Sequence, residues 1–372
     1  MAGDKQIQKA GDNSQQFQAN TIIVNQGIDE KRAREICTEM FEIAKRDFTQ
    51  EAMASAINRV QQLEDRLMSR MLPIEGAISS FANPAFQVLL TNAQRTAIAT
   101  ERETDYDMLA ELLVCHIEKG NMRKTRAGIS KAVEIIDKID DDALCALTVV
   151  HSVNSFLPAS SSCKIGIKVL ADLFEKLEYM DLPLGIDWIE HLEMLNTIRI
   201  IPFNRFPKID EYYSEQLKNY VAVGIEIGSD NYKKALELLY SVSLSTDCLI
   251  SNDLMPNYVK LPFDDRNDFK DISLTKSEII NGVIQQYKFD LKDEHKRIFK
   301  EVLSLYSCDG AVISESKKLL KEEWNRYESL TNLRQWWDAL TFRFSITHIG
   351  KVLAHTNARR CDKNLPELHL NL

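Results

Sequence analysis

The sequence lacks the cysteine patterns of metal sites and redox motifs. Its seven cysteines are odd in number, lie far apart and include no C-x-x-C pair. Scattered cysteines of this kind are typical of a reducing compartment, where they serve as small core residues. The chain also has no run of about 18 to 20 apolar residues, and its N-terminus lacks the basic-then-apolar order of a secretory signal. We therefore expect a cytoplasmic protein without a membrane span.

Clustered positive charge is missing as well. Lys and Arg total 46 against 55 Asp and Glu, which gives a net charge of -9. Affinity for a phosphate backbone rests on clustered Lys and Arg, so we do not expect a nucleic-acid partner.

The common catalytic and nucleotide-binding motifs are also absent. The chain contains no G-x-x-x-x-G-K-[ST] or G-x-G-x-x-G loop, no G-x-S-x-G elbow and no H-E-x-x-H pair. We therefore predict no catalytic residue, no cofactor and no metal ligand. The sequence favours a protein that is not an enzyme. A catalytic site assembled from distant residues stays open, because such residues need not be neighbours in the chain.

What the chain does have is apolar residues at helical spacing. Its 372 residues, 44% hydrophobic and 27% charged, are typical of a soluble globular protein. After residue 29, apolar positions recur as they do in amphipathic helices. We predict a mainly α fold with a few short strands. The stretch at 158–162 is the best linker candidate, and it divides the body into helical subdomains at 30–157 and 158–372.

Start and stop signals delimit many of these helices. Asp29 and Asn83 are expected N-caps, Pro84 suits a first helical position, and Thr347 caps the last helix. A short strand is predicted at 221–227, where a short buried helix stays open as the alternative, and another strand is predicted at 342–346. Helices are predicted near residues 29–48, 50–72, 84–97, 108–117, 129–139, 140–157, 163–180, 184–199, 279–287, 291–307, 314–328 and from 347 onward.

The region after residue 250 has fewer clear signals. Residues 275–278 have the pattern of a capping box, which predicts the helix at 279–287. Residues 254–271 hold two prolines and an acidic run, so we expect them to be irregular and exposed. Three tryptophans are expected in the core rather than at a ligand site: Trp324, Trp336 and Trp337.

Two polar clusters have both a structural and a functional interpretation. The acidic run at 140–142 suits the positive end of a helix dipole. We favour this role over a cation site, because no patterned loop of oxygen ligands surrounds the run. Asp187 and His191 share one helix face, as a base and its orienting group would, but a surface ion pair is the favoured interpretation.

The C-terminal helix carries the remaining candidates. His348 and His355 lie on one helix face with Cys361 beyond, but a zinc site would need a fourth ligand and tighter spacing. A small basic end either contacts an anion or is simply solvated; it comprises Lys351, Arg359, Arg360 and Lys363.

The first 29 residues differ in composition from the rest of the chain. They are rich in Gln and Asn, free of Pro and nearly balanced in charge. Residues 17–24 and 6–8 predict two short strands, and residues 11–14 have turn chemistry. A lone hairpin is marginal in water, so we predict that the segment 1–29 pairs with other copies of itself. The residues expected to make this contact are Ile7, Gln8, Gly11, Asp12, Asn13, Phe17, Gln18, Thr21, Ile22, Ile23 and Val24.

Two other interpretations of this segment stay open. It is either a polar tail without structure or a hairpin packed on its own helical body. We favour pairing between copies, because side-chain amides form ladders along stacked strands, while Ile and Val fill dry contacts between sheets.

The pattern G-D-K-Q-x-Q-x-x-G-D-N-S at residues 3–14 resembles the opening of a largely uncharacterised family of bacterial proteins with a helical body. Such N-terminal segments have been compared with RHIM-like amyloid signalling motifs. Ile7, Gln8 and Gly11 are the residues comparable with the RHIM core. Lys9 and Ala10 make the spacing longer here than in that core.

A second resemblance lies near the C-terminus. Residues 346–350, I-T-H-I-G, are similar to the end of some bacterial abortive-infection helical domains and to the closing part of winged-helix modules. The resemblances imply a bacterial defence or signalling context and no particular reaction. We therefore expect a self-assembling defence or signalling protein that forms homo-oligomers through its N-terminal segment. The alternatives are a helical scaffold that binds a protein partner and an enzyme with a dispersed site.

Overall fold

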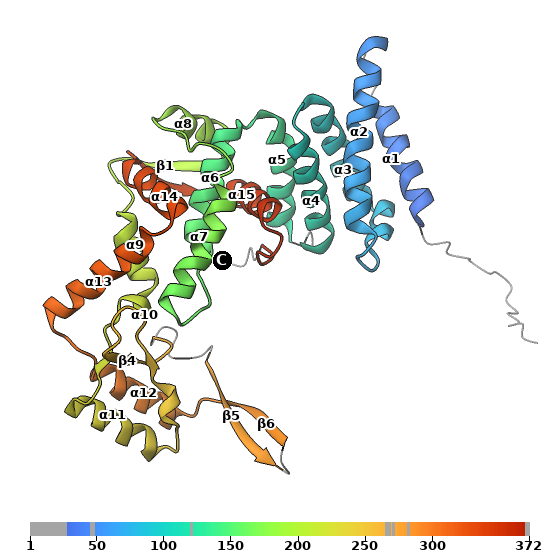
Figure 1. Cartoon of the computed structure of the whole chain (residues 1–372). Coiled ribbons are helices and arrows are strands. Elements are labelled where there is room, and N and C mark those ends of the chain that lie inside the picture. The colour runs from blue at the N-terminus through green and yellow to red at the C-terminus, as the bar shows by residue number, and fades with distance from the viewer. Residues whose placement is uncertain are drawn as a thin grey trace, which may run out of the picture.

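The computed structural model describes residues 28–44, 49–119, 122–264, 269, 272–280 and 283–368. This part of the chain is mainly helical with a few short strands (Figure 1), so the predicted mainly α class is confirmed. The segment at 1–27, for which a β hairpin is predicted, lies outside the described residues. None of the described helices is both long and apolar enough to cross a bilayer.

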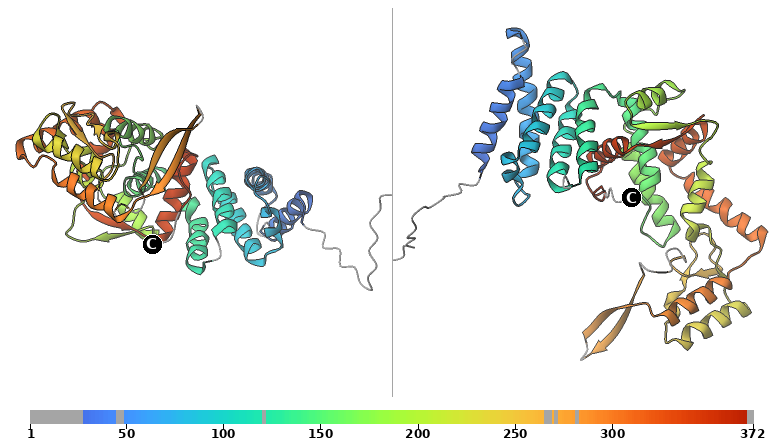
Figure 2. Two further views of the ribbon diagram at one scale, coloured as in Figure 1. Left: turned by 90° about the horizontal axis from the view of Figure 1, so that it is seen from below. Right: turned by 180° about the vertical axis from the view of Figure 1, so that it is seen from behind.

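The N-terminal helices stand side by side and form an elongated arm (Figures 1 and 2). Two of them begin at the predicted caps. Asp29 Oδ1 accepts a hydrogen bond from the Arg32 N–H at 2.8 Å, and Asn83 Oδ1 accepts one from the Ala85 N–H at 2.9 Å. The arm consists of α1 (Glu30–Ala44), α2 (Gln50–Met71), the 3-10 helix η2 (Ala77–Ala82), α3 (Pro84–Ala99), α4 (Glu103–Lys119) and α5 (Arg123–Ile135).

The centre of the chain packs together with its C-terminal end. Strands β1 and β7 pair antiparallel, with Ile198 opposite Ile346. The last helix, α15, begins at the predicted cap, where Thr347 Oγ1 accepts a hydrogen bond from the Gly350 N–H at 3.2 Å. It packs on α4, α5 and α6. This part contains η3 (Ile136–Lys138), α6 (Asp141–Ser155), α7 (Cys163–Leu177), α8 (Asp187–Met194), β1 (Ile198–Ile201), α9 (Ile209–Gln216), α10 (Lys218–Val221), α13 (Gly310–Trp324), α14 (Glu328–Ala339), β7 (Arg343–Ile346) and α15 (His348–Cys361).

One apolar core runs from the arm through the centre. It extends from Ala33 in α1 to Leu368 after α15 and includes residues on both sides of position 158. Residues 158–162 form an irregular connection between α6 and α7, and the predicted division of the body at this point stays a prediction. The tryptophans expected in the core are buried: Trp324, Trp336 and Trp337.

Residues between α10 and α13 form a smaller unit with its own core. That core includes Ile225, Leu239 and Phe299 beside a three-stranded sheet in the order β2-β4-β3. The Ser307 N–H donates a hydrogen bond to the Gly224 carbonyl at 2.8 Å, so the two ends of this unit lie side by side. The unit contains β2 (Ile225–Glu226), α11 (Asp230–Ser241), η4 (Thr246–Cys248), β3 (Ile250–Ser251), β4 (Tyr258–Lys260) and α12 (Asp293–Ser304).

A β hairpin extends away from this unit (Figures 1 and 2). Strands β5 (Ser273–Ile280) and β6 (Val283–Asp290) pair antiparallel, so the helix predicted at 279–287 is wrong. Ile280 pairs with Val283, which leaves a connection of two residues, and the intervening sequence Asn-Gly is the one that such connections favour. The hairpin pattern therefore outweighs the short capping-box pattern.

Two further expectations need correction. Within the predicted strand at 221–227, Val221 ends α10 and β2 is only two residues long. Residues 254–264 are not uniformly exposed, because Lys260 and Leu261 are buried where β4 joins the core of the smaller unit. The Lys260 ammonium donates a hydrogen bond to the Asn219 carbonyl at 2.5 Å, and burial lowers its pKa to about 8.

Candidate ligand-binding site

The residues predicted for oligomerisation lie outside the described part of the chain, so their role stays a prediction. The described chain begins at Ile28, beside α1 at the outer end of the arm (Figure 1).

A pocket of about 380 Å³ lies where the end of α6, the start of α15 and the C-terminal segment meet. We call it the histidine pocket. Its side chains come from elements that are distant in sequence, and α15 contacts both α5 and α6 in the fold. The residues that define the pocket are Lys124, His151, Ser155, His348, Lys351 and His355.

Two glycines let α15 approach its neighbours closely. A Cβ atom on Gly128 in α5 would lie 2.4 Å from Cδ2 of the His348 ring. A Cβ atom on Gly350 would lie 2.1 Å from the Thr197 carbonyl oxygen. Both distances are shorter than real Cβ contacts, so glycine at these two positions permits the close approach of α15.

A chain of hydrogen bonds runs through the pocket from Ser155 to the C-terminal segment. His151 Nδ1 lies 3.3 Å from the Ser155 hydroxyl, and His151 Nε2 lies 3.2 Å from His355 Nδ1. His355 Nε2 lies 2.9 Å from the Pro366 carbonyl oxygen. A carbonyl oxygen only accepts, so His355 donates to Pro366 and its Nδ1 accepts from His151. His151 Nδ1 is then left to accept from the Ser155 hydroxyl.

Burial keeps His151 neutral. The residue is 4% exposed, and burial, followed by His355 and Lys351, lowers its pKa to about 3. Phe156 packs edge-on against the ring, with the two centroids 5.9 Å apart. A neutral imidazole accepts a hydrogen bond well, but this site disfavours a positive charge on it. His151 is therefore better suited to orient the Ser155 hydroxyl than to hold a proton.

Two lysines bring positive charge to the pocket. Lys124 and Lys351 form no ion pair within the described residues. Burial first, and then these two lysines, lower the pKa of His348. Glu367 also lines the pocket, but its carboxylate pairs with the Lys119 ammonium at 3.1 Å. Unpaired ammonium groups attract anions, so the arrangement is suited to hold a small anion.

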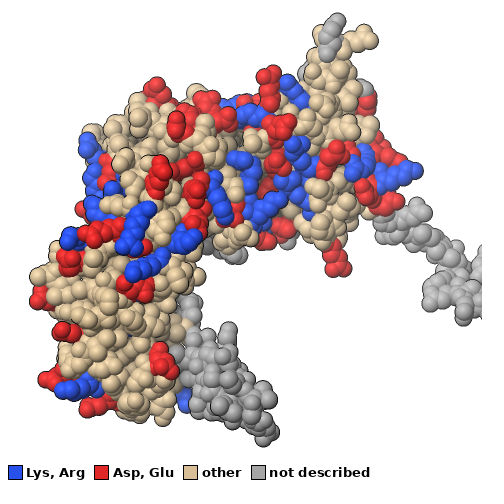
Figure 3. All heavy atoms as spheres, viewed as in Figure 1, with Lys and Arg blue, Asp and Glu red and all other residues tan. Residues whose placement is uncertain are grey.

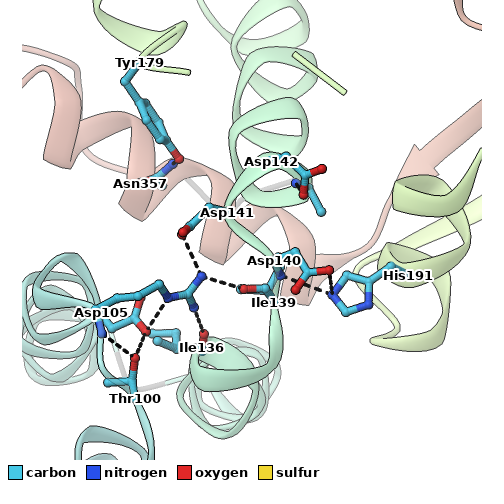
Figure 4. Close-up of polar contacts among 12 residues, drawn as sticks. Thr100, Asp105, Ile136, Ile139, Asp140, Asp141, Asp142, Tyr179, His191 and Asn357 are labelled. Carbon is cyan, nitrogen blue, oxygen red and sulfur yellow. Dashed lines mark hydrogen bonds and ion pairs between the residues drawn. The ribbon is translucent and has the colours of Figure 1, made fainter. Parts of the chain in front are cut away.

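The acidic run at 140–142 lies at the start of α6 and makes structural contacts (Figure 4). The Arg102 guanidinium donates hydrogen bonds to Asp141 Oδ1 at 2.7 Å and to Asp105 Oδ2 at 3.0 Å. Asp142 Oδ1 accepts from the next backbone N–H at 2.6 Å. In the described ranges, no group of three or more His, Cys, Asp or Glu side chains is placed to hold a metal ion.

His191 approaches Asp140 rather than Asp187. Its Nε2 accepts a hydrogen bond from the Asp140 N–H at 3.2 Å and lies 3.8 Å from Asp140 Oδ2 (Figure 4). His191 Nε2 is therefore engaged at the start of α6, and within the described residues no hydrogen bond or ion pair joins His191 to Asp187.

The predicted basic end divides between two sites, and Arg359, Arg360 and Lys363 line a separate pocket of about 330 Å³. Lys351 lines the histidine pocket, together with His348 and His355. Arg359 Nη1 lies 3.5 Å from Glu111 Oε1, and the Arg360 guanidinium lies over the Tyr179 ring, 5.0 Å from its centroid. The two arginines thus connect α15 to other elements.

Sequence reasoning did not find the histidine pocket, because its buried pair, His151 and His355, is 204 residues apart in the chain. One signal was present. His151 lies within a helix whose residues from Ala143 to Val153 are all buried. A polar side chain in such a helix requires a partner, but the sequence does not say which residue supplies it.

Charges of both signs are interspersed on the face of the molecule shown in Figure 3, rather than separated into one large basic patch.

Comparison with known proteins gives a family but no activity. One family model matches the chain over residues 27–368, and it represents an uncharacterised family. The match begins after the G-D-K-Q-x-Q-x-x-G-D-N-S pattern at 3–14, so it does not bear on the resemblance of that segment. No curated protein and no solved structure shows significant similarity to the chain.

Proposed function

We propose, from the premise that the chain belongs to the family whose model matches residues 27–368, that this protein is a self-assembling bacterial defence or signalling protein. The N-terminal segment at 1–29 joins copies of the chain in the cytoplasm. The helical body recognises a small anionic ligand in the histidine pocket.

The place where the segment joins the body supports this division of roles. The described chain begins beside α1, at the outer end of the arm, and α15 with the histidine pocket lies at the other end of the arm (Figure 1). Copies joined at the outer end of the arm leave the pocket accessible. Strand pairing suits such a junction, because main-chain hydrogen bonds supply affinity and alternate side chains set the register.

The observation that carries the ligand proposal is the absence of carboxylate partners for Lys124 and Lys351 in the described structure. Both lysines line the pocket, where Lys351 is half-buried and Lys124 exposed. An anion that binds between them gains charge-assisted hydrogen bonds and removes repulsion between the two lysines.

Deletion of residues 2–27 tests the assembly role. The truncated chain is expected to stay folded and helical but to lose the large assemblies that the full chain forms, measured by size exclusion with light scattering. Ile23→Lys should act in the same direction, because it places charge within a stacked sheet. The matched control is Val88→Lys, at an apolar residue that is 63% exposed on α3. Equal particle sizes for the full and truncated chains would refute self-assembly through this segment.

Titration calorimetry with inorganic phosphate tests the pocket. The double variant Lys124→Gln/Lys351→Gln is expected to bind phosphate about tenfold or more weakly, because hydrogen bonds to charged groups contribute about 1.5–3 kcal/mol. Lys131→Gln is the control, since Lys131 is also an exposed residue of α5 but pairs with Glu134 at 2.6 Å. Equal affinities for the wild type and the double variant would refute the anion site. That result would leave the assembly test unaffected.

The hydrogen-bond chain supports a second candidate function, the hydrolysis of an ester. Ser155 Oγ would bond to the carbonyl carbon while its proton passes to His151 and then to the leaving alkoxide; water would then release the acyl group as a carboxylate. The low pKa of His151 makes it a weak base for this step. Turnover of p-nitrophenyl acetate that is lost in Ser155→Ala but kept in Ser160→Ala would favour this function, and equal rates would exclude it.

A further inference from the structure

A second polar cavity lies apart from the histidine pocket. It is an open groove of about 690 Å³ between α14 and the segment that follows α7. Its walls carry carboxylates and carboxamides beside an apolar surface, and none of the described residues that line it is Lys or Arg. We call it the carboxylate groove and define it by Glu178, Asp181, Leu184, Asn332, Gln335 and Trp336.

Glu178 is the unusual group in this groove. It is the residue at which α7 ends, and its backbone N–H donates to the Phe174 carbonyl at 2.9 Å. Its side-chain Oε1 is buried and has no hydrogen-bond partner within the described residues. Burial alone raises the pKa of Glu178 to about 7. A carboxylate with a buried oxygen that lacks a donor is costly to ionise, so a cation bound in the groove beside Glu178 would stabilise the ionised form.

The opposite wall supplies free polar groups in a regular arrangement. Asn332 and Gln335 are exposed, lie three residues apart on α14 and therefore share one helix face. Neither side chain makes a hydrogen bond within the part of the chain that the structure describes. Asp181 adds a second carboxylate without an ion pair in that part.

An apolar surface continues from these polar groups. Leu184 is 78% exposed, and the Trp336 ring lines the groove while its Nε1 donates to the Pro183 carbonyl at 2.8 Å. The aliphatic part of a ligand can lie on this surface, while its polar end reaches the carboxylates.

We propose that the carboxylate groove binds a small organic cation of the alkylammonium or alkylguanidinium class, whose N–H groups donate to Glu178. Asn332 and Gln335 contact the ligand from the other wall, and Leu184 covers its aliphatic chain. This site goes beyond the proposed function and does not rest on it, since the histidine pocket has the opposite charge and none of the same residues.

Several other charged and titratable groups lie around Glu178. Tyr179 and Asp181 lie on the same segment, Cys145 lies on α6, and Arg360 stacks on the Tyr179 ring from α15. Burial raises the pKa of Cys145 to about 12 and raises the pKa of Tyr179 as well. Glu178 therefore changes charge near neutrality while these two groups stay protonated.

Titration calorimetry of the full chain with agmatine, an alkylguanidinium, tests the proposal. The wild type is expected to bind agmatine more tightly at pH 8 than at pH 6, because the cation favours the ionised carboxylate. Glu178→Gln should weaken binding at pH 8 about tenfold or more, as expected for losing a hydrogen bond to a charged group. It should also abolish the dependence on pH. Glu175→Gln, at an exposed carboxylate in the same helix, is the control and should leave both properties unchanged.

Three results would overturn the proposal. These are no binding of agmatine by the wild type, equal affinities for the wild type and Glu178→Gln, or a wild-type affinity that does not change between pH 6 and pH 8. Glu178→Gln removes a buried charge, so loss of folding is not expected, and a thermal melt of the variant verifies this. Failure of the phosphate or assembly tests above would not affect this outcome.

Discussion

At the scale of single residues, contacts between neighbours in the sequence could be predicted. Contacts between residues that meet only in the fold could not. Asn83 and Thr347 cap their helices as predicted, because an N-cap joins residues two or three positions apart. Glu178 carried no sequence signal. It becomes unusual only in the fold, where no donor among the described residues reaches its buried Oε1. The pairing of His151 with His355 likewise depends on two helices that meet only after folding.

The buried His151 predicts how stability changes with pH. In the unfolded chain its pKa returns to about 6.5, whereas in the folded protein it is lowered to about 3. Between these values only the unfolded state takes up the proton. Stability should therefore fall as the pH drops below about 6.5, by up to about 1.4 kcal/mol per pH unit from this group.

Urea denaturation between pH 7 and pH 5 measures this effect. His151→Gln keeps a donor near His355 but does not titrate. The slope of its free energy of unfolding against pH should therefore be smaller than that of the wild type, by the equivalent of about one bound proton. His191→Gln, at the partly exposed histidine beside Asp140, serves as the comparison and should keep the wild-type slope. Identical slopes for His151→Gln and the wild type would show that the ring is not held neutral by burial.

At the scale of elements, regular apolar spacing predicted the helices of the arm because each buries one face against its neighbours. The same reasoning did not delimit α14, and it gave a helix where β5 and β6 form a hairpin. Short segments with β-branched residues fit both the helical period of about 3.6 residues and the strand period of about 2. The signal that distinguishes them here is the Asn-Gly sequence at 281–282, which the helix prediction did not take into account.

Gly350→Ala tests how closely α15 packs. Alanine favours a helix interior over glycine, but its Cβ would lie 2.1 Å from the Thr197 carbonyl oxygen, which belongs to the backbone and cannot easily move. We expect a loss of about 1–3 kcal/mol in the free energy of unfolding, measured with urea. Gly310→Ala is the matched control, because no atom of the described residues lies within 4 Å of a Cβ there. A Gly350→Ala variant as stable as Gly310→Ala would contradict the close contact.

At the scale of the whole molecule, packing follows the cores rather than the order of the chain. The main core joins residues from Ala33 to Tyr220 with residues from Leu320 to Leu368. The smaller core, from Ile225 to Leu305, is formed by the intervening chain. The sequence analysis identified a linker candidate but not this insertion. A chain that leaves one core and later returns to it need not change in composition at either point.

Excision of residues 225–306 is therefore expected to leave the main body folded. The Ser307 N–H and the Gly224 carbonyl are 2.8 Å apart, so a short Gly-Ser linker can close the chain without strain. The shortened protein should keep cooperative thermal unfolding, followed by circular dichroism, and should bind phosphate as the full chain does. Removal of α7 is the contrasting deletion, because its Ile167, Leu170 and Phe174 belong to the main core, and it should abolish folding. An excised chain that aggregates or melts without cooperativity would show that the main body requires the inserted unit, through contacts such as that between Lys260 and the Asn219 carbonyl.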